Sequence, residues 1–133
     1  MSYSAILAGL NERFATVPTI ARVLDYEPTS IQAFPTLYSL LDRVEYLPAG
    51  QVRATRYRVL HRLCLRWQDN ERAEEQLVPY VDSLAAAIRA DPRLGGRITS
   101  GLATVVEAQG TFVVIGGALL RCLDLYTETL VKE

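Results

Sequence analysis

The sequence is poor in the residues that build metal and thiol centres. Its 133 residues contain two cysteines, Cys64 and Cys122, and one histidine, His61, without any C-x-x-C spacing. A structural zinc ion usually takes four such ligands, so we expect no metal site. Two isolated cysteines are more often small buried hydrophobic residues, and we expect that role for both.

An excess of positive charge is missing as well. Lysine and arginine number 14 against 15 acidic residues, and the net charge is −1. The chain as a whole therefore has no electrostatic attraction to nucleic acid or to an anionic membrane. Lysine is almost absent, since Lys132 stands against 13 arginines. Arginine suits fixed, bidentate pairing in interfaces, but a GC-rich coding bias would produce the same composition, and both explanations stay open.

The chain also lacks a long hydrophobic run, a phosphate-binding loop and a low-complexity linker. No basic segment precedes the first apolar stretch, which residues 11–13 interrupt, so we expect neither a signal peptide nor a membrane span, and synthesis in the cytoplasm. The glycine pairs at 95–96 and 116–117 lack the spacing of a phosphate-binding loop. Half of the residues are apolar, which predicts a single folded domain over residues 1–133.

Apolar periodicity predicts two helices. The first covers residues 3–16. The second begins at Asp69 or Asn70, either of which can cap it, and contains Pro79, which predicts a kink or a later start near Val78. Asp91-Pro92 ends it, and a glycine pair follows as a turn. Its expected buried stripe is Leu77, Val81, Leu84 and Ile88.

The remaining segments are typical of strands. A short strand is expected at 20–26, and a long hairpin over 37–67 with its turn at PAGQ, residues 48–51. Two further strands, at 98–108 and 111–131, are expected to join at AQGT, with Gly116-Gly117 as a bulge or a close backbone approach. The predicted order α-β-β-β-α-β-β gives an α+β domain, in which an antiparallel or mixed sheet carries two helices and a long projecting hairpin.

The run TRYRVLHRLCLRW, residues 55–67, separates into two faces when placed on a strand. Thirteen strand residues span roughly 43 Å, so the hairpin must project past its sheet or contain a bulge, and its exposed edge indicates a partner. The odd-numbered positions are mostly apolar, and the even-numbered positions are rich in arginine. The apolar side carries Tyr57, Val59, His61, Leu63, Leu65 and Trp67, and the other carries Arg56, Arg58, Arg62 and Arg66.

No catalytic constellation emerges from these residues. His61 and Cys64 are three positions apart and so lie on opposite faces of the strand, which excludes a local Cys-His pair. His61 lies on the apolar face of the strand, which favours a hydrogen-bonded packing role. We therefore expect neither an enzyme nor a cofactor.

The arginines have three interpretations: a solvated strand face, a nucleic-acid groove, or a surface between subunits. The groove lacks interleaved aromatic residues. Arginines between subunits would pair with carboxylates such as Glu71, Glu74, Asp124 or Glu128, although the last two can also neutralise them within the sheet. We favour the interface, with Arg56, Arg58, Arg62, Arg66, Asp124 and Glu128 as its candidate residues.

The segment PYVDSLAAAIRADPRLGGRI, residues 79–98, resembles the helix-and-turn segment of tail terminator (tail completion) proteins of long-tailed bacteriophages. The match consists of an Ala-Asp-Pro-x-Leu-Gly-Gly turn, and LDYEPTSIQAFPTLY and the opening helix are similar to the family in the same order. The turn is a folding device, so the resemblance bears on fold more than on contacts. Its residues are Ala90, Asp91, Pro92, Leu94, Gly95 and Gly96.

The resemblance implies a virion protein of the tail–neck region, in which a six-fold ring caps the tail tube and joins the head-side connector. The implied partners are further copies of the chain, the tail tube protein and the neck protein. DNA would pass through the ring channel without sequence-specific binding, and no membrane is involved. The alternatives are another phage neck or head–tail joining protein and a small nucleic-acid-binding protein that uses the arginines of 55–67.

Overall fold

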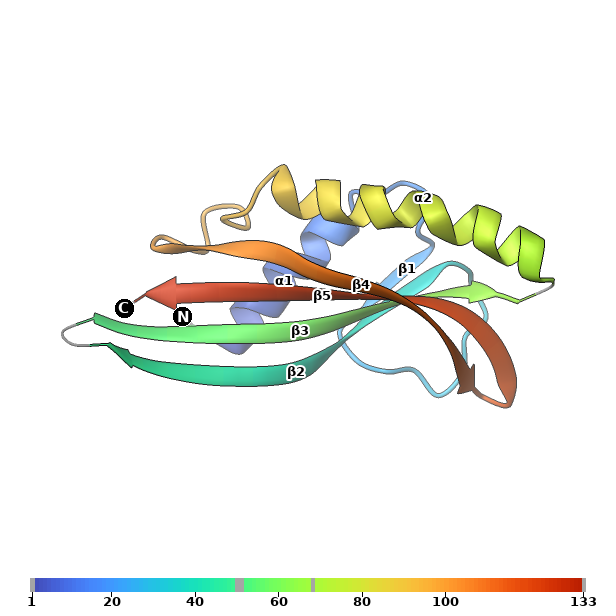
Figure 1. Ribbon diagram of the computed structural model, residues 1–133, viewed down its shortest axis with the longest axis horizontal. Coiled ribbons are helices and arrows are strands. Elements are labelled where there is room, and N and C mark those ends of the chain that lie inside the picture. Colours follow the sequence, from blue (N-terminus) through green and yellow to red (C-terminus); the bar gives the residue numbers. More distant parts are fainter. Residues whose placement is uncertain (1, 50–51, 68, 133) are drawn as a thin grey trace.

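The computed structural model describes residues 2–49, 52–67 and 69–132. Within them the chain forms helix α1 (Tyr3–Phe14), strands β1 (Arg22–Leu24), β2 (Thr36–Ala49) and β3 (Val52–Arg66), helix α2 (Asn70–Arg89), and strands β4 (Gly101–Ile115) and β5 (Ala118–Lys132). The order α-β-β-β-α-β-β and the α+β class are confirmed (Figure 1). Of the predicted turn at 48–51, Gly50 and Gln51 lie outside the described residues.

The five strands form one mixed sheet in the order β1-β2-β3-β5-β4. Strand β1 runs parallel to the start of β2, and the other neighbours are antiparallel. Strand β3 is therefore central and β4 forms one edge. Because β1 pairs only with Thr36–Tyr38, the rest of β2 forms the opposite edge.

Both helices begin at capping residues that the sequence supplies. The Ser2 hydroxyl accepts the Ala5 N–H, and the Asp69 carboxylate accepts the Arg72 N–H at 2.9 Å, as expected of N-caps. Helix α2 continues through Pro79, so the later start near Val78 is wrong. Val81 is exposed and Tyr80 is buried in its place, because the buried stripe of α2 is turned toward Ala73, Leu77, Tyr80, Leu84, Ala87 and Ile88.

The helices pack on one face of the sheet, which we call the helix face. Its side chains on β3 are the odd-numbered ones, and Val59, Leu63 and Leu65 are buried there as predicted. Trp67 is wrongly assigned to this packing: it follows the end of β3, is 40% exposed, and donates its indole N–H to Asn70.

A second, smaller core lies on the opposite face. The segment between β1 and β2 covers one end of that face, where Ile31 and Phe34 contact Tyr38 and the cysteines. Cys64 and Cys122 are free and buried, as predicted, and face each other across β3 and β5 with their sulfur atoms 3.2 Å apart. The hydrogen bond from Cys122, together with burial, raises the pKa of the Cys64 thiol.

The long hairpin of β2 and β3 contains the bulge that was one of the two alternatives for its length. The register shifts between Leu41 and Arg43, where Asp42 is the extra residue. The paired ends of β2 and β3 extend beyond both helices in Figure 1, but β5 pairs with β3 from Ala54 to Arg66. The expectation of a free edge therefore fails for β3 and holds for β2.

The turn predicted at AQGT is wrong, because β4 runs without a break to Ile115. The hairpin reverses at Gly116 and Gly117, whose φ angles of 60° and 79° are those that a two-residue β-turn with both central residues at positive φ requires. The predicted close approach is also present, since a Cβ on Gly116 would lie 3.0 Å from the Thr29 carbonyl oxygen.

Candidate surface around the arginines of β3

The even-numbered side chains of β3 point away from the helices, and we call this side of the sheet the arginine face. Arg56, Arg58 and Arg62 lie there in the part of the sheet that the 25–35 segment leaves open. Register places Arg58 directly opposite Glu128 on β5, and Arg62 opposite Asp124. Cross-strand neighbours of opposite charge attract each other.

The pair between Arg62 and Asp124 is the most buried on this face. The guanidinium donates to both carboxylate oxygens, at 2.7 and 2.9 Å, and the Asp124 side chain is only 7% exposed. The hydrogen bonds to Asp124 raise the pKa of Arg62 further above its usual value. Arg62 also donates to the Tyr38 hydroxyl, and burial raises the pKa of Tyr38 to about 12. This ion pair is therefore part of the internal packing of the chain.

Arg58 joins three other strands through carboxylates. Its guanidinium lies 2.9 Å from Asp42 on β2, 3.0 Å from Glu107 on β4 and 3.4 Å from Glu128 on β5, and it stacks on the Tyr126 ring. Glu128 also lies 3.9 Å from Arg56.

Glu45 extends the network to the β2 edge. Its carboxylate lies 3.2 Å from Arg56 and 2.8 Å from Arg43. Asp42, Glu45 and Glu107 were missed from the sequence, because their closeness to the arginines depends on register and on two bulges. Their only signal was charge inside predicted strands.

The network carries no excess of positive charge. Four arginines, at 43, 56, 58 and 62, pair with five carboxylates, at 42, 45, 107, 124 and 128, so the paired groups sum to −1. A phosphate would have to displace carboxylates that already hold the guanidinium groups. The surface is therefore unlike a nucleic-acid groove, which presents unneutralised cations.

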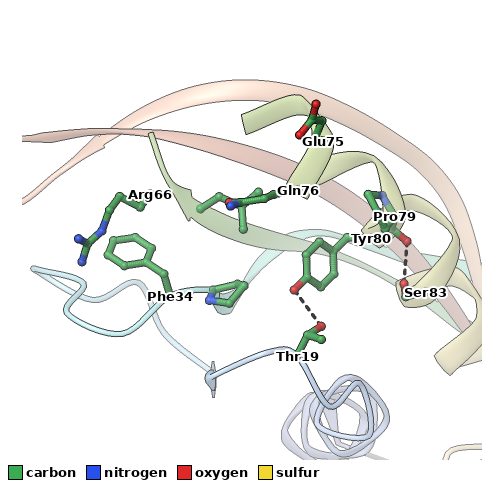
Figure 2. A pocket seen from close by; sticks show the side chains of 10 residues that line it. Thr19, Phe34, Arg66, Glu75, Gln76, Pro79, Tyr80 and Ser83 are labelled. Carbon is green, nitrogen blue, oxygen red and sulfur yellow. Dashed lines mark hydrogen bonds between the residues drawn. The ribbon is translucent and has the colours of Figure 1, made fainter. Parts of the chain in front are cut away.

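Arg66 does not belong to this network. It lies at the far end of β3, where its guanidinium stacks on the Phe34 ring at 5.2 Å. It lines a hollow of about 580 Å³ between the 34–35 segment and α2. Figure 2 shows Arg66 beside Phe34, with Glu75 on the helix at another side of the hollow. The Tyr80 hydroxyl in the floor donates to Thr19 at 2.9 Å. Arg66 thus separates from the other candidate residues.

The two α2 carboxylates proposed as arginine partners also lie elsewhere. Glu74 pairs with Arg121 on β5 at 2.6 Å. Glu71 is exposed in the first turn of α2. Neither reaches the arginine face within this chain.

His61 is buried on the helix face, beneath Phe14. Its Nδ1 lies 2.7 Å from the Ser39 hydroxyl, which donates to the Asn11 side-chain oxygen, and its Nε2 lies 2.8 Å from the Thr127 hydroxyl. Since the single Ser39 proton goes to Asn11, Nδ1 carries the imidazole proton and Nε2 accepts from Thr127. Burial lowers the pKa of His61 to about 3. The predicted packing role is confirmed, with complete burial and both nitrogens used.

The residues of the predicted turn after α2 hold the end of that helix. The Asp91 carboxylate accepts the Gly95 N–H at 2.7 Å, and Leu94, Gly95 and Gly96 have φ angles of 54°, 70° and 83°. Leu94 is buried against Gly9 of α1, where a Cβ would lie 2.8 Å from that of Leu94. The turn therefore fixes α2 to α1.

Among the described residues no three His, Cys, Asp or Glu side chains gather closely enough to hold a metal ion. No helix in the same residues is both long and apolar enough to cross a membrane. Comparison with known proteins found no family model and no curated protein that matches the chain.

Proposed function

We propose that the protein caps a bacteriophage tail tube as a ring and joins the tail to the head-side connector. The observation that carries this proposal is the Ala-Asp-Pro-x-Leu-Gly-Gly segment, residues 90–96, with its resemblance to tail terminator proteins. In the fold this segment stops α2 and docks Leu94 on α1. The α+β fold with two helices on one sheet face is the subunit that the resemblance implies.

The balanced charge of the arginine face supports a ring that lets DNA pass. A channel lined with free arginines would hold phosphates through many contacts at once. Here each of Arg56, Arg58 and Arg62 lies within 4 Å of a carboxylate of its own chain. This arrangement favours the structural role over the nucleic-acid-binding alternative.

In this proposal the arginine face contributes to subunit contacts only through residues on its outer strands, β2 and β4. Arg62 is not a suitable probe of an interface, because reversal of its charge would oppose it to Asp124 and disturb the fold itself. Arg43 and Glu107 lie on the two outer strands and have the most exposed side chains of the network, so a neighbouring copy can reach them most easily.

The test uses the purified protein and polymerising tail tube protein from the same genome. We expect rings in light scattering and negative-stain microscopy, rings at one end of each tube, and tubes that stop growing when the protein is added. Tubes of unchanged length, with no protein bound at their ends, would refute the capping role. Binding to the connector protein without binding to the tube would favour another neck component.

A DNA titration separates the nucleic-acid alternative. We expect no binding to a 40-base-pair duplex at physiological salt. Binding that weakens steeply with salt and is lost in Arg56→Gln would favour the alternative.

A further inference from the structure

The sheet ends in two edges that face no other strand in the described part of the chain. Strand β4 pairs with β5 on its inner side. On its outer side the Ala103 N–H donates to the Pro92 carbonyl at 2.8 Å, so the free part of this edge follows Ala103. Strand β2 is covered by β1 over Thr36–Tyr38 and is free from Ser39 to Ala49. Free edges present rows of backbone donors and acceptors that pair readily with another strand.

The β4 edge has few of the devices that keep an edge strand soluble. Its sequence, GLATVVEAQGTFVVI, contains no lysine and no proline, and Glu107 is its only charged residue. Four of its large apolar side chains are between 44% and 65% exposed: Leu102, Val106, Phe112 and Val114. A strand of this kind is a pairing surface that a monomer leaves uncovered.

The two edges have matching directions. Three successive antiparallel pairings, from β2 to β3 to β5 to β4, leave β2 and β4 running in opposite directions. Two copies of the chain in the same orientation therefore bring β4 of one beside β2 of the next as antiparallel neighbours. We propose that β4 of each copy pairs with the free part of β2 of the next copy, so that the sheet continues from subunit to subunit.

Charge and shape fit one register of this pairing. Arg43 on β2 and Glu107 on β4 both point to the arginine face, have side chains 58% and 49% exposed, and carry opposite charges. When they lie opposite each other, the bulges at 41–43 and 105–107 lie side by side.

The contact joins two different surfaces, so it leads to a ring when the rotation between copies closes and to a filament when it does not. Only the choice of a closed ring over a filament rests on the proposed function. A contact between two β4 strands would instead give a dimer and stop.

Lysine pairs at exposed apolar positions test the two edges separately, because lysine on an edge blocks strand pairing. One variant is Leu102→Lys/Val106→Lys on β4, and the other is Leu41→Lys/Tyr46→Lys on β2. Mass is measured by light scattering after size exclusion. We expect wild type to assemble, each variant to be a folded monomer, and an equimolar mixture to form a dimer and nothing larger, because each variant retains one intact edge.

The matched control is Val78→Lys/Leu119→Lys, which adds the same charge at exposed apolar positions away from both free edges. It should assemble like wild type. The proposal is overturned if wild type is monomeric at high concentration, if the edge variants or the control fail this pattern, or if the mixture stays monomeric.

Tube assays separate this inference from the function. Assembly through both edges without any effect on tube length would keep the inference and refute the capping role. Edge variants that still assemble and cap tubes would refute the strand-pairing inference and keep the capping role.

Discussion

The two faces of β3 bury polar groups in opposite ways. On the helix face His61 is fully buried and neutral, with Ser39 and Thr127 at its two nitrogens. On the arginine face Arg62 keeps its charge, and Asp124 accepts two hydrogen bonds from it.

Access to water explains the difference. Helix α1, through Phe14, shields His61 from water, and desolvation favours the neutral ring. The open sheet face leaves Arg62 partly hydrated, so a charged pair can persist there. One strand thus supports a neutral network and an ionic one, and each can be broken separately.

The largest effect is expected from Asp124→Ala, which leaves the Arg62 charge without its partner in a partly buried site. Unfolding in urea should show a loss of about 3 kcal/mol. The double variant Arg62→Leu/Asp124→Leu should lose less than the single one, because no charge is left uncompensated. If the single and the double variant lost equal stability, the unpaired Arg62 charge would carry no cost, which would contradict this prediction.

The next effect is a pH dependence that belongs to His61. Its pKa is about 3 when folded and about 6.5 when unfolded, so below pH 6.5 the unfolded chain binds a proton that the folded chain does not. The stability is complete above pH 6.5 and falls as pH drops toward 3. The loss is about 2.7 kcal/mol at pH 4.5.

The measurement compares wild type with His61→Leu in urea from pH 7 to pH 4. Carboxylates contribute equally to both proteins, so the difference between their pH slopes isolates the histidine. Parallel slopes would contradict the neutral, buried ring.

A smaller effect is expected from Thr127→Val, which keeps the shape of the side chain and removes the hydroxyl that His61 Nε2 accepts from. The unsatisfied nitrogen should cost about 1–2 kcal/mol. Thr129→Val is the control: Thr129 is equally buried, and its hydroxyl has no partner among the described residues. That change should be neutral or stabilising, and equal losses would assign no special role to the His61 bond.

The smallest effect is expected from Glu107→Gln on the arginine face. Glu107 is half exposed and is one of three carboxylates around Arg58. Its removal should cost about 0.5 kcal/mol or less, and the cost should shrink further in 1 M salt. A loss above 2 kcal/mol, or one insensitive to salt, would show that the network acts as a single buried unit.

Local patterns in the sequence predicted much of this fold. The alternation along β3 separated its two faces, Asp69 marked the start of α2, and Gly95 and Gly96 marked the turn. These features depend on neighbours in the chain, which periodicity and capping chemistry report directly.

Features set by distant residues could not be predicted in this way. Gly110 suggested a turn, but it lies within β4, where it pairs with Leu123 of β5. The Arg121 guanidinium lies over it, 2.9 Å from where a Cβ would be. Likewise, the pairing of Arg58 with Asp42 and Glu107 depends on two bulges. Of the candidate site, the cross-strand pairing of Asp124 and Glu128 was an open alternative from the sequence, whereas the carboxylates on β2 and β4 were not.

The facing thiols of Cys64 and Cys122 can report how often this part of the sheet opens. Both are fully buried between β3 and β5, beneath the 25–35 segment. An alkylating reagent can reach them only when this part of the molecule opens, so the rate of labelling in native buffer reports how often that happens. Followed by mass spectrometry during assembly, the same two sulfur atoms would show whether a subunit becomes more rigid once its edges have found partners.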